Sequence, residues 1–320
     1  MLASPDVVVF GAMDARVHAV RLADGVRIWD TRLPRLSITS VRVLPDGAIL
    51  AGVSVKSRGR GMLATLSAAD GTVQWTWNAA GMLQGAVAAA GTRLVCASLV
   101  QRASEVACVA RGSRRPLWRT AFDDWVFGVL VHEDMVFAPC ADNRMHCLDL
   151  ATGERLRTFA AHHLVCALPL IHDSALYFGA HDAVFYAYEL NGGLRWRVEL
   201  ADRMSGAAAA AGDLVVFGGW DGFVRALDAR SGEERWAHDA GAPIVATPAA
   251  GGGIIYIGTD GGRLLALDAT SGALLDMFPS HQPLGGEIKT RPLLTPRGIV
   301  VTAHDGAGYL VKPGTLGSAS

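Results

Sequence analysis

An all-β fold built from repeated sheets is predicted by three observations: short apolar runs at strand period, abundant turn residues and an internal repeat. The apolar runs are about four to eight residues long, alternate apolar and polar side chains, and are broken by Gly, Asp and Asn. Glycine accounts for 37 of 320 residues, above its usual share of about 7%. No window keeps a helical period long enough to predict a substantial helix.

The internal repeat is visible when four segments are aligned. They are VVFGGWDGFVRALDARSGEERW (215–236), IIYIGTDGGRLLALDATSGALL (254–275), VVVFGAMDARVHAVRLADGVRIW (7–29) and LYFGAHDAVFYAYELNGGLRW (176–196). Each has an apolar strand, a turn marked by Asp and often Gly, and an alternating strand. A second turn of the Asp-x-x-(Ser/Thr/Asn)-Gly type, or a shortened form, then leads to a strand that often carries Trp. Repeats of this kind predict the four-stranded blades of a β-propeller.

Tryptophan positions measure the period of the repeat. Trp29, Trp75 and Trp118 are 46 and 43 residues apart, and Trp196 and Trp236 are 40 apart. A 320-residue chain at about 40 residues per blade gives eight blades. The first repeat lacks a clear innermost strand and the last lacks a clear outer one, so seven blades is the alternative. Ring closure would then combine strands from the two ends. Short loops throughout predict that one propeller domain takes up residues 1–320.

Composition and charge exclude several classes of function. A net charge of −1 gives no reason to expect binding to nucleic acid, which needs clustered cations. The longest apolar runs fall short of the roughly 20 residues of a membrane span, and no signal peptide is visible. We therefore expect a cytoplasmic protein with no membrane contact. The five cysteines are odd in number and mostly lie in apolar runs, so they are expected to be reduced core residues.

The repeats resemble those of the pyrroloquinoline-quinone-like family, whose propellers occur in quinoprotein dehydrogenases and in a bacterial outer-membrane assembly lipoprotein. The resemblance is carried by ALDARSGEERW (226–236), ALDATSGALL (266–275), CLDLATGERL (147–156) and AYELNGGLRW (187–196). It implies tryptophan docking, in which Ala packs under the Trp of a neighbouring blade and the Gly turn allows the hairpin. Trp29, Trp75, Trp196 and Trp236 are then packing residues.

Departures from the family limit what the resemblance implies for function. The dehydrogenases are much longer and carry adjacent cysteines above the quinone, and this sequence has no Cys-Cys pair. No cofactor is expected. The lipoprotein's lipobox cysteine and export signal are also missing. No C-x-x-C pair is present, so no zinc knuckle and no metal are predicted; metal binding is a minority hypothesis that would need His181, His304 or a carboxylate to converge from other blades. His146 is expected to satisfy a local hydrogen bond.

Candidate binding residues come from two sets of loops that share one face of a propeller. One set enters the innermost strands, and the other joins the second and third strands around the central channel. Sites favour such concave places with convergent polar groups. The candidates for channel or ligand binding are Asp124, Trp125, His163, His181, Arg203, Trp220, Glu287, Lys289 and His304.

Each candidate also has a structural interpretation. Aspartates followed by Gly, such as Asp221 and Asp260, are ordinary hairpin residues. Trp125 and Trp220 lie outside the docking slot, where they could stack on a flat ligand, anchor a partner or plug the channel.

The histidines and the charged residues also have more than one interpretation. His162 and His163 would point to opposite faces of a strand, so they cannot chelate one metal together. Glu287 and Lys289 alternate and could face the channel, where Asp124 and Arg203 could join them in a charged ring.

Two functions of different class remain open. The favoured one is a non-catalytic interaction scaffold or ligand-sensing module that binds a protein partner or an organic small molecule, because no catalytic motif is present. The alternative is a bacterial biosynthetic enzyme for a small molecule, with its site in the channel. There, Trp125 or Trp220 would stack the substrate, and His163, Asp124 or Glu287 would move protons.

Overall fold

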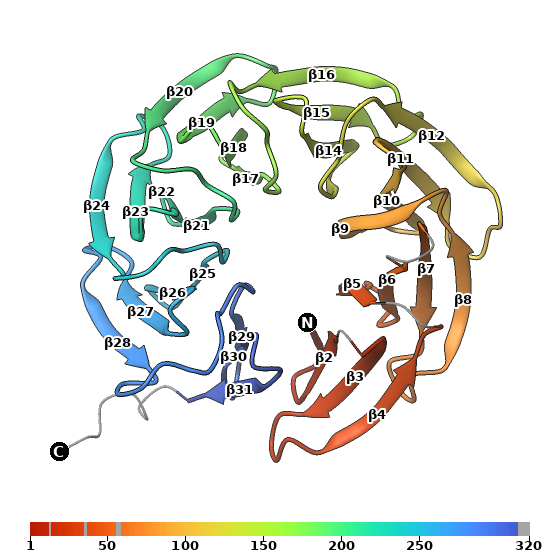
Figure 1. The fold of residues 1–320 in the computed structure, drawn as a ribbon, viewed down its shortest axis with the longest axis horizontal. Coiled ribbons are helices and arrows are strands. Elements are labelled where there is room, and N and C mark those ends of the chain that lie inside the picture. The colour runs from red at the N-terminus through yellow and green to blue at the C-terminus, as the bar shows by residue number, and fades with distance from the viewer. Residues whose placement is uncertain (13, 35–36, 56–58, 313–320) are drawn as a thin grey trace. The chain divides into compact units, whose positions relative to one another are not determined.

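A computed structural model describes residues 1–12, 14–34, 37–55 and 59–312. The chain divides into two compact units, Met1–Ala160 and Ala161–Ser320, called unit 1 and unit 2. All regular structure in the described residues is β-strand, arranged as eight sheets, four in each unit (Figure 1). This confirms the predicted all-β, eight-bladed β-propeller over the seven-bladed alternative. No helix in the described ranges is long and apolar enough to cross a membrane.

Unit 1 contains blades 1 to 4, each of four antiparallel strands in chain order. The strands of blades 1 and 2 are β1 (Leu2–Ser4), β2 (Val7–Gly11), β3 (Arg16–Arg21), β4 (Arg27–Arg32), β5 (Ser37–Val43), β6 (Ile49–Val55), β7 (Arg60–Leu66) and β8 (Val73–Asn78). The strands of blades 3 and 4 are β9 (Met82–Ala90), β10 (Arg93–Val100), β11 (Ala103–Ala110), β12 (Pro116–Phe122), β13 (Leu130–His132), β14 (Met135–Cys140), β15 (Arg144–Asp149) and β16 (Arg155–Ala160).

Unit 2 contains blades 5 to 8, of which the last has three strands in the described residues. The strands of blades 5 and 6 are β17 (Leu170–His172), β18 (Ala175–Gly179), β19 (Val184–Glu189), β20 (Leu194–Glu199), β21 (Ala209–Ala211), β22 (Leu214–Gly218), β23 (Phe223–Asp228) and β24 (Glu234–Asp239). The strands of blades 7 and 8 are β25 (Ala249–Gly251), β26 (Ile254–Gly258), β27 (Leu264–Asp268), β28 (Leu274–Phe278), β29 (Leu293–Thr295), β30 (Gly298–Thr302) and β31 (Gly308–Val311).

The two ends of the chain differ in how well the sequence predicted their strands. The first blade does have its own innermost strand, β1, whose Leu2 pairs with Val8 of β2. The sequence analysis missed it because three residues are too few to show a period. In the described residues the last blade stops at β31, as the missing outer strand predicted. The prediction of a single domain over the whole chain stays a prediction.

Apolar side chains pack between neighbouring blades and form the core. In unit 2, Phe185 of blade 5 stacks on Phe217 of blade 6 with ring centroids 4.1 Å apart, and both rings are buried. Several middle strands, such as β18, are buried on both faces, which explains the near-continuous apolar runs in the sequence. A single blade could not bury these faces alone, so stacking of neighbours stabilises the fold.

Tryptophan docking joins each of several blades to the next. Trp29 of blade 1 donates its indole N–H to the Ala68 carbonyl of blade 2 at 2.9 Å, and Trp236 of blade 6 donates to Ala269 of blade 7 at 3.0 Å. Trp75, Trp118 and Trp196 make the equivalent bonds at 2.9 to 3.1 Å. The predicted packing role of these side chains is therefore confirmed.

The glycine of the second turn is required by this docking. Gly232 has a φ of 76°, and a Cβ built there would lie 2.7 Å from Cδ2 of Trp196. Gly272 lies in the same way against Trp236. Only glycine can adopt this left-handed backbone conformation and also leave room for the indole ring against its Cα.

Antiparallel order places two kinds of loop at one end of every blade. The loop that enters the first strand and the turn between the second and third strands both lie at this end. In unit 2 we call this end the rim. It contains the entry loops before β17, β21, β25 and β29 and the turns β18–β19, β22–β23, β26–β27 and β30–β31. Figure 1 shows the short first strands β17, β21, β25 and β29 along the inner side of unit 2.

Candidate functional site

One backbone hydrogen bond recurs in all four blades of unit 2 and builds the rim. In each blade, a residue of the turn between the second and third strands donates its N–H to a carbonyl of the entry loop. The pairs are His181 to Leu164 (3.1 Å), Trp220 to Arg203 (3.2 Å), Asp260 to Pro243 (2.9 Å) and His304 to Glu287 (3.0 Å). Both loop sets of the sequence prediction are therefore hydrogen-bonded to one another within each blade.

Arg203 and Trp220 form a stacked pair on blade 6. The Arg203 guanidinium carbon lies 4.2 Å from the centroid of the Trp220 ring. Trp220 also donates its indole N–H to Oγ of Ser205 at 2.9 Å, which fixes the ring. Arg203 is exposed and Trp220 is half-buried, so part of this pair is accessible to a partner.

His181 of blade 5 faces this pair across the blade boundary. Its Nε2 lies 3.2 Å from Oγ of Ser205 and 3.4 Å from Sγ of Cys166. Burial, helped by the positive charge of Arg203, lowers the pKa of His181. Burial also raises the pKa of the Cys166 thiol. Both shifts favour a neutral imidazole beside a protonated thiol, which is the opposite of an activated nucleophile.

His162 and His163 lie in the entry loop before β17, and not in a strand as the sequence analysis assumed. The reason is that this blade's first strand begins only at Leu170. His163 stacks on His181 with ring centroids 6.2 Å apart, and its Nδ1 accepts the Leu164 N–H at 2.9 Å. His162 instead contacts Asp182 through its backbone N–H at 2.8 Å.

Blades 7 and 8 bring four ionisable side chains of the rim together. Lys289 Nζ lies 2.6 Å from Oε2 of Glu287 and 3.6 Å from Oδ2 of Asp260, and His304 Nδ1 lies 3.3 Å from Glu287. The hydrogen bond from Lys289 lowers the pKa of Glu287, whereas burial raises the pKa of Asp260. Residues 285–291 form no strand, yet Glu287 and Lys289 do share a side, as their alternation predicted.

The sequence analysis suggested a charged ring in which Asp124 and Arg203 join Glu287 and Lys289. In the structure, Lys289 and Glu287 instead form ion pairs with Asp260 and His304, respectively. The guanidinium of Arg203 stacks on the ring of Trp220.

Asp124 and Trp125 belong to the entry loop of blade 4 in unit 1. The Trp125 side chain is 44% exposed and lies 6.5 Å, centroid to centroid, from Phe127. Asp124 accepts the Trp125 N–H at 2.8 Å. The recurring rim bond occurs here as well, because Ala141 donates to the Trp125 carbonyl at 2.8 Å.

The turn aspartates have the structural role that hairpin chemistry predicted for them. Asp221 accepts the Phe223 N–H at 3.1 Å and pairs with Arg225 at 2.7 Å. Asp260 is different, because Gly261 takes the equivalent turn position and Asp260 lies one residue earlier. Its Oδ1 is buried and has no hydrogen-bond partner among the described residues.

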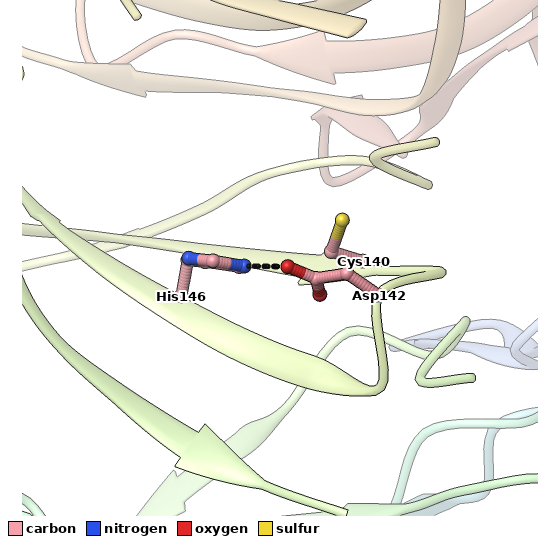
Figure 2. Close-up of side chains that lie close together, drawn as sticks. All are labelled: Cys140, Asp142 and His146. Atoms are coloured by element: carbon pink, nitrogen blue, oxygen red, sulfur yellow. Dashed lines mark hydrogen bonds and ion pairs between the residues drawn. The ribbon is translucent and has the colours of Figure 1, made fainter. Parts of the chain in front are cut away.

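A cluster that the sequence analysis missed lies in blade 4 of unit 1. One ligand atom from each of Cys140, Asp142 and His146 lies within 4.8 Å of the other two (Figure 2). His146 does make the local hydrogen bond that was predicted, from Nε2 to Oδ2 of Asp142 at 2.8 Å. The signal in the sequence is Cys-x-Asp-x-x-x-His, whose spacing matches no common zinc motif.

Two hollows in unit 2 lie at the ends of the blades opposite the rim. The larger has a volume of about 780 Å³ and is bordered by the β21–β22 and β25–β26 turns, including Asp213 and Gly252. The smaller, of about 250 Å³, is bordered by His172, Asp173 and Arg230. Neither hollow includes a candidate residue from the sequence analysis.

Comparison with known proteins places these features in a family. A family model described as outer membrane protein assembly factor BamB matches residues 59–163 and 158–311. No curated protein matches the sequence in a direct comparison.

Solved structures share the fold at low sequence identity. BamB from Moraxella catarrhalis is 19% identical, with a TM-score of 0.77 over 95% of this chain and 90% of that one. The computationally designed Ika8 protein is 18% identical, with a TM-score of 0.81 over 96% and 94%. The C-terminal WD40 domain of Sif2 is 15% identical, with a TM-score of 0.82 over 97% and 93%. The chain therefore belongs to the family of PQQ-like β-propellers described as outer membrane protein assembly factor BamB.

Proposed function

We propose that this propeller is a non-catalytic scaffold that binds a protein partner through the rim of unit 2. The observation that carries the proposal is the Arg203–Trp220 pair, held by Ser205 and partly exposed. Arg and Trp are, with Tyr, the residues enriched among interface hot spots. The matching family is described as an outer membrane protein assembly factor, and an assembly factor acts on other proteins.

The flanking charges support a protein partner with complementary polar groups. The side chain of His304 is 62% exposed and that of Glu287 is 41% exposed, beside the more covered Lys289 and Asp260. An aromatic anchor with a polar rim is the usual anatomy of a protein interface. Because these side chains carry charges of both signs, they would determine how a partner is oriented more than how tightly it binds.

The enzyme alternative has less support. A general acid or base needs a pKa matched to its task. The pKa of Glu287 is lowered by its hydrogen bond with Lys289, so this carboxylate is held ionised, and the Cys166–His181 pair is held neutral. A cytoplasmic location and a bacterial source are proposed from the sequence composition alone.

The test compares what tagged variants of the protein capture from an extract of the cells that naturally produce it. Tagged wild type, the double variant Arg203→Ala/Trp220→Ala and the control Arg230→Ala are compared by quantitative mass spectrometry. Arg230 is the matched control, because it is an arginine of the same blade at the end opposite the rim, with a side chain 82% exposed. We expect the double variant to lose a stoichiometric protein partner by about tenfold or more.

The control variant should retain that partner at the wild-type level. Equal capture by all three proteins would contradict the proposal. So would stoichiometric recovery of a small molecule with no protein, which would favour the enzyme alternative.

A further inference from the structure

We propose that Cys140, Asp142 and His146 form a binding site for a divalent transition metal of the zinc class, built on one hairpin of blade 4. The three ligand atoms already lie within 4.8 Å of one another, before any metal is considered (Figure 2). A tetrahedral zinc ion with bonds of about 2.0 to 2.3 Å requires ligand separations of roughly 3.3 to 3.8 Å, about 1 Å less than this upper limit. Small rotations of the side chains would therefore complete the site.

The register of the hairpin explains why these residues meet. Cys140 is the last residue of β14 and pairs with Arg144, while His146 of β15 pairs with Ala138. Alternate residues of a strand share a face, so Cys140 and His146 lie on the same side of the sheet as diagonal neighbours. Asp142 lies in the connecting turn, where its Oδ1 accepts the Arg144 N–H at 3.2 Å. Its other oxygen, Oδ2, is thereby turned toward His146.

The donor set is one that zinc uses in proteins. Thiolate, imidazole and carboxylate are all zinc ligands, and three protein ligands leave a fourth position for water or another group. Binding replaces the proton of the Cys140 thiol by the metal, and that proton goes to solvent. Nothing in the proposal requires an oxidant or a reductant.

The surroundings of the cluster shield it from bulk water. Cys140 is fully buried and the His146 side chain is only 7% exposed. Phe122 of blade 3 packs edge-on against the His146 ring, with centroids 5.0 Å apart. The backbone of Val126 bridges to that of Cys140. Buried metal sites keep their ions better than exposed ones, because water and competing ligands have less access.

Blade 1 provides an internal comparison that isolates the role of the cysteine. Its turn has the same pair, with His18 Nε2 3.3 Å from Oδ2 of Asp14, and Asp14 also accepts a turn N–H at 2.9 Å. The register of the two hairpins is equivalent, and Ala12 stands where blade 4 has Cys140. An Asp-His pair is therefore a turn feature shared by two blades, and the thiol of Cys140 is what adds a third ligand.

The experiment uses the full chain and measures binding of Zn²⁺ alone by competition with a chromophoric chelator. We expect one site per chain. Cys140→Ala should weaken it by more than about 100-fold, because a lost ligand costs at least as much as a lost outer-shell contact. Cys147→Ala, which removes a neighbouring buried cysteine outside the cluster, should leave the affinity unchanged.

A second pair of variants guards against a folding defect in the cysteine variant. Asp142→Asn keeps a turn acceptor but loses the carboxylate, and Asp14→Asn makes the same change in blade 1. Only the blade 4 variant should lose Zn²⁺ affinity. Co²⁺ bound to the wild type should also show a sulfur-to-cobalt charge-transfer band, because the thiolate is a ligand.

Three results would overturn the proposal. They are the absence of a stoichiometric site in the wild type, equal affinity in Cys140→Ala or Asp142→Asn and in their controls, and a bound Co²⁺ without the charge-transfer band.

Discussion

Trp118 and Trp125 are close in sequence but lie in opposite surroundings. Trp118 is 8% exposed, and its indole N–H donates to the Leu150 carbonyl of the next blade at 2.9 Å. Trp125 is 44% exposed and packs only loosely on Phe127. Residues of the same type therefore stabilise the fold in one place and are available for recognition in the other.

This difference predicts different effects of substitution at the two positions. Trp118→Ala should lower the free energy of unfolding by about 3–5 kcal/mol, because it leaves a cavity between two blades. Trp125→Ala should change it by less than about 0.5 kcal/mol, as for an exposed side chain. Urea unfolding followed by circular dichroism measures both. Equal losses for the two variants would contradict the assignment of Trp118 as a docking residue.

Single residues were predicted well where one repeat explains them. The docking role of Trp236 follows from its place in the repeat, and the hydrogen bond to Ala269 confirms it. The pairing of Lys289 with Asp260 was not predicted, because these side chains come from different blades. Cys140 was missed for another reason: its partners are set by the register of a hairpin, which sequence spacing alone does not reveal.

At the scale of the element, the second turn of blades 4, 6 and 7 depends on one ionised aspartate in each, namely Asp149, Asp228 and Asp268. In blade 6, Asp228 Oδ1 accepts the N–H groups of Arg230 and Ser231 at 3.0 and 2.9 Å, and its Oδ2 pairs with Arg235 at 2.8 Å. The ion pair with Arg235 is the main cause that lowers the pKa of Asp228, followed by the turn hydrogen bonds. Asp268 of blade 7 has the same arrangement of turn bonds.

A pH dependence follows from the sign of this shift. Because the pKa of Asp228 is lower in the folded state, its ionised form stabilises the fold above the unfolded value of about 3.9. That contribution is lost as the pH falls through the lower, folded pKa. Asp228→Asn should therefore lower the urea midpoint at pH 7, and the difference from wild type should shrink as the pH falls below about 4. A difference that stays constant over the same pH range would contradict this.

The elements themselves were largely predictable, because strand period and turn chemistry agree along the chain. The exceptions were short first strands. Strand β1 has three residues and was missed, and His162 and His163 were placed in a strand that begins only at Leu170. The apolar residues that follow the two histidines, such as Val165, belong to the entry loop and are buried without being in a strand.

At the scale of the whole molecule, the repeat decided the fold and left the function open. Eight blades follow from the repeat length, and the shared fold of the Sif2 WD40 domain and the designed Ika8 protein shows how little sequence identity this architecture needs. We expect function to depend on the loops, because in unit 2 the recurring rim bond holds the loops of all four blades while their side chains vary. His181, Trp220, Asp260 and His304 occupy one equivalent position in four successive blades.

Site-specific photo-crosslinking tests the proposed protein-binding rim most directly. A benzophenone amino acid replaces exposed His304 at the rim or, as the control, exposed Arg230 at the opposite end of blade 6. The proposal predicts that irradiation in native extract links one protein to the probe at the rim, with little or none at the control position. A protein linked at the control position and absent from the rim would contradict the proposal.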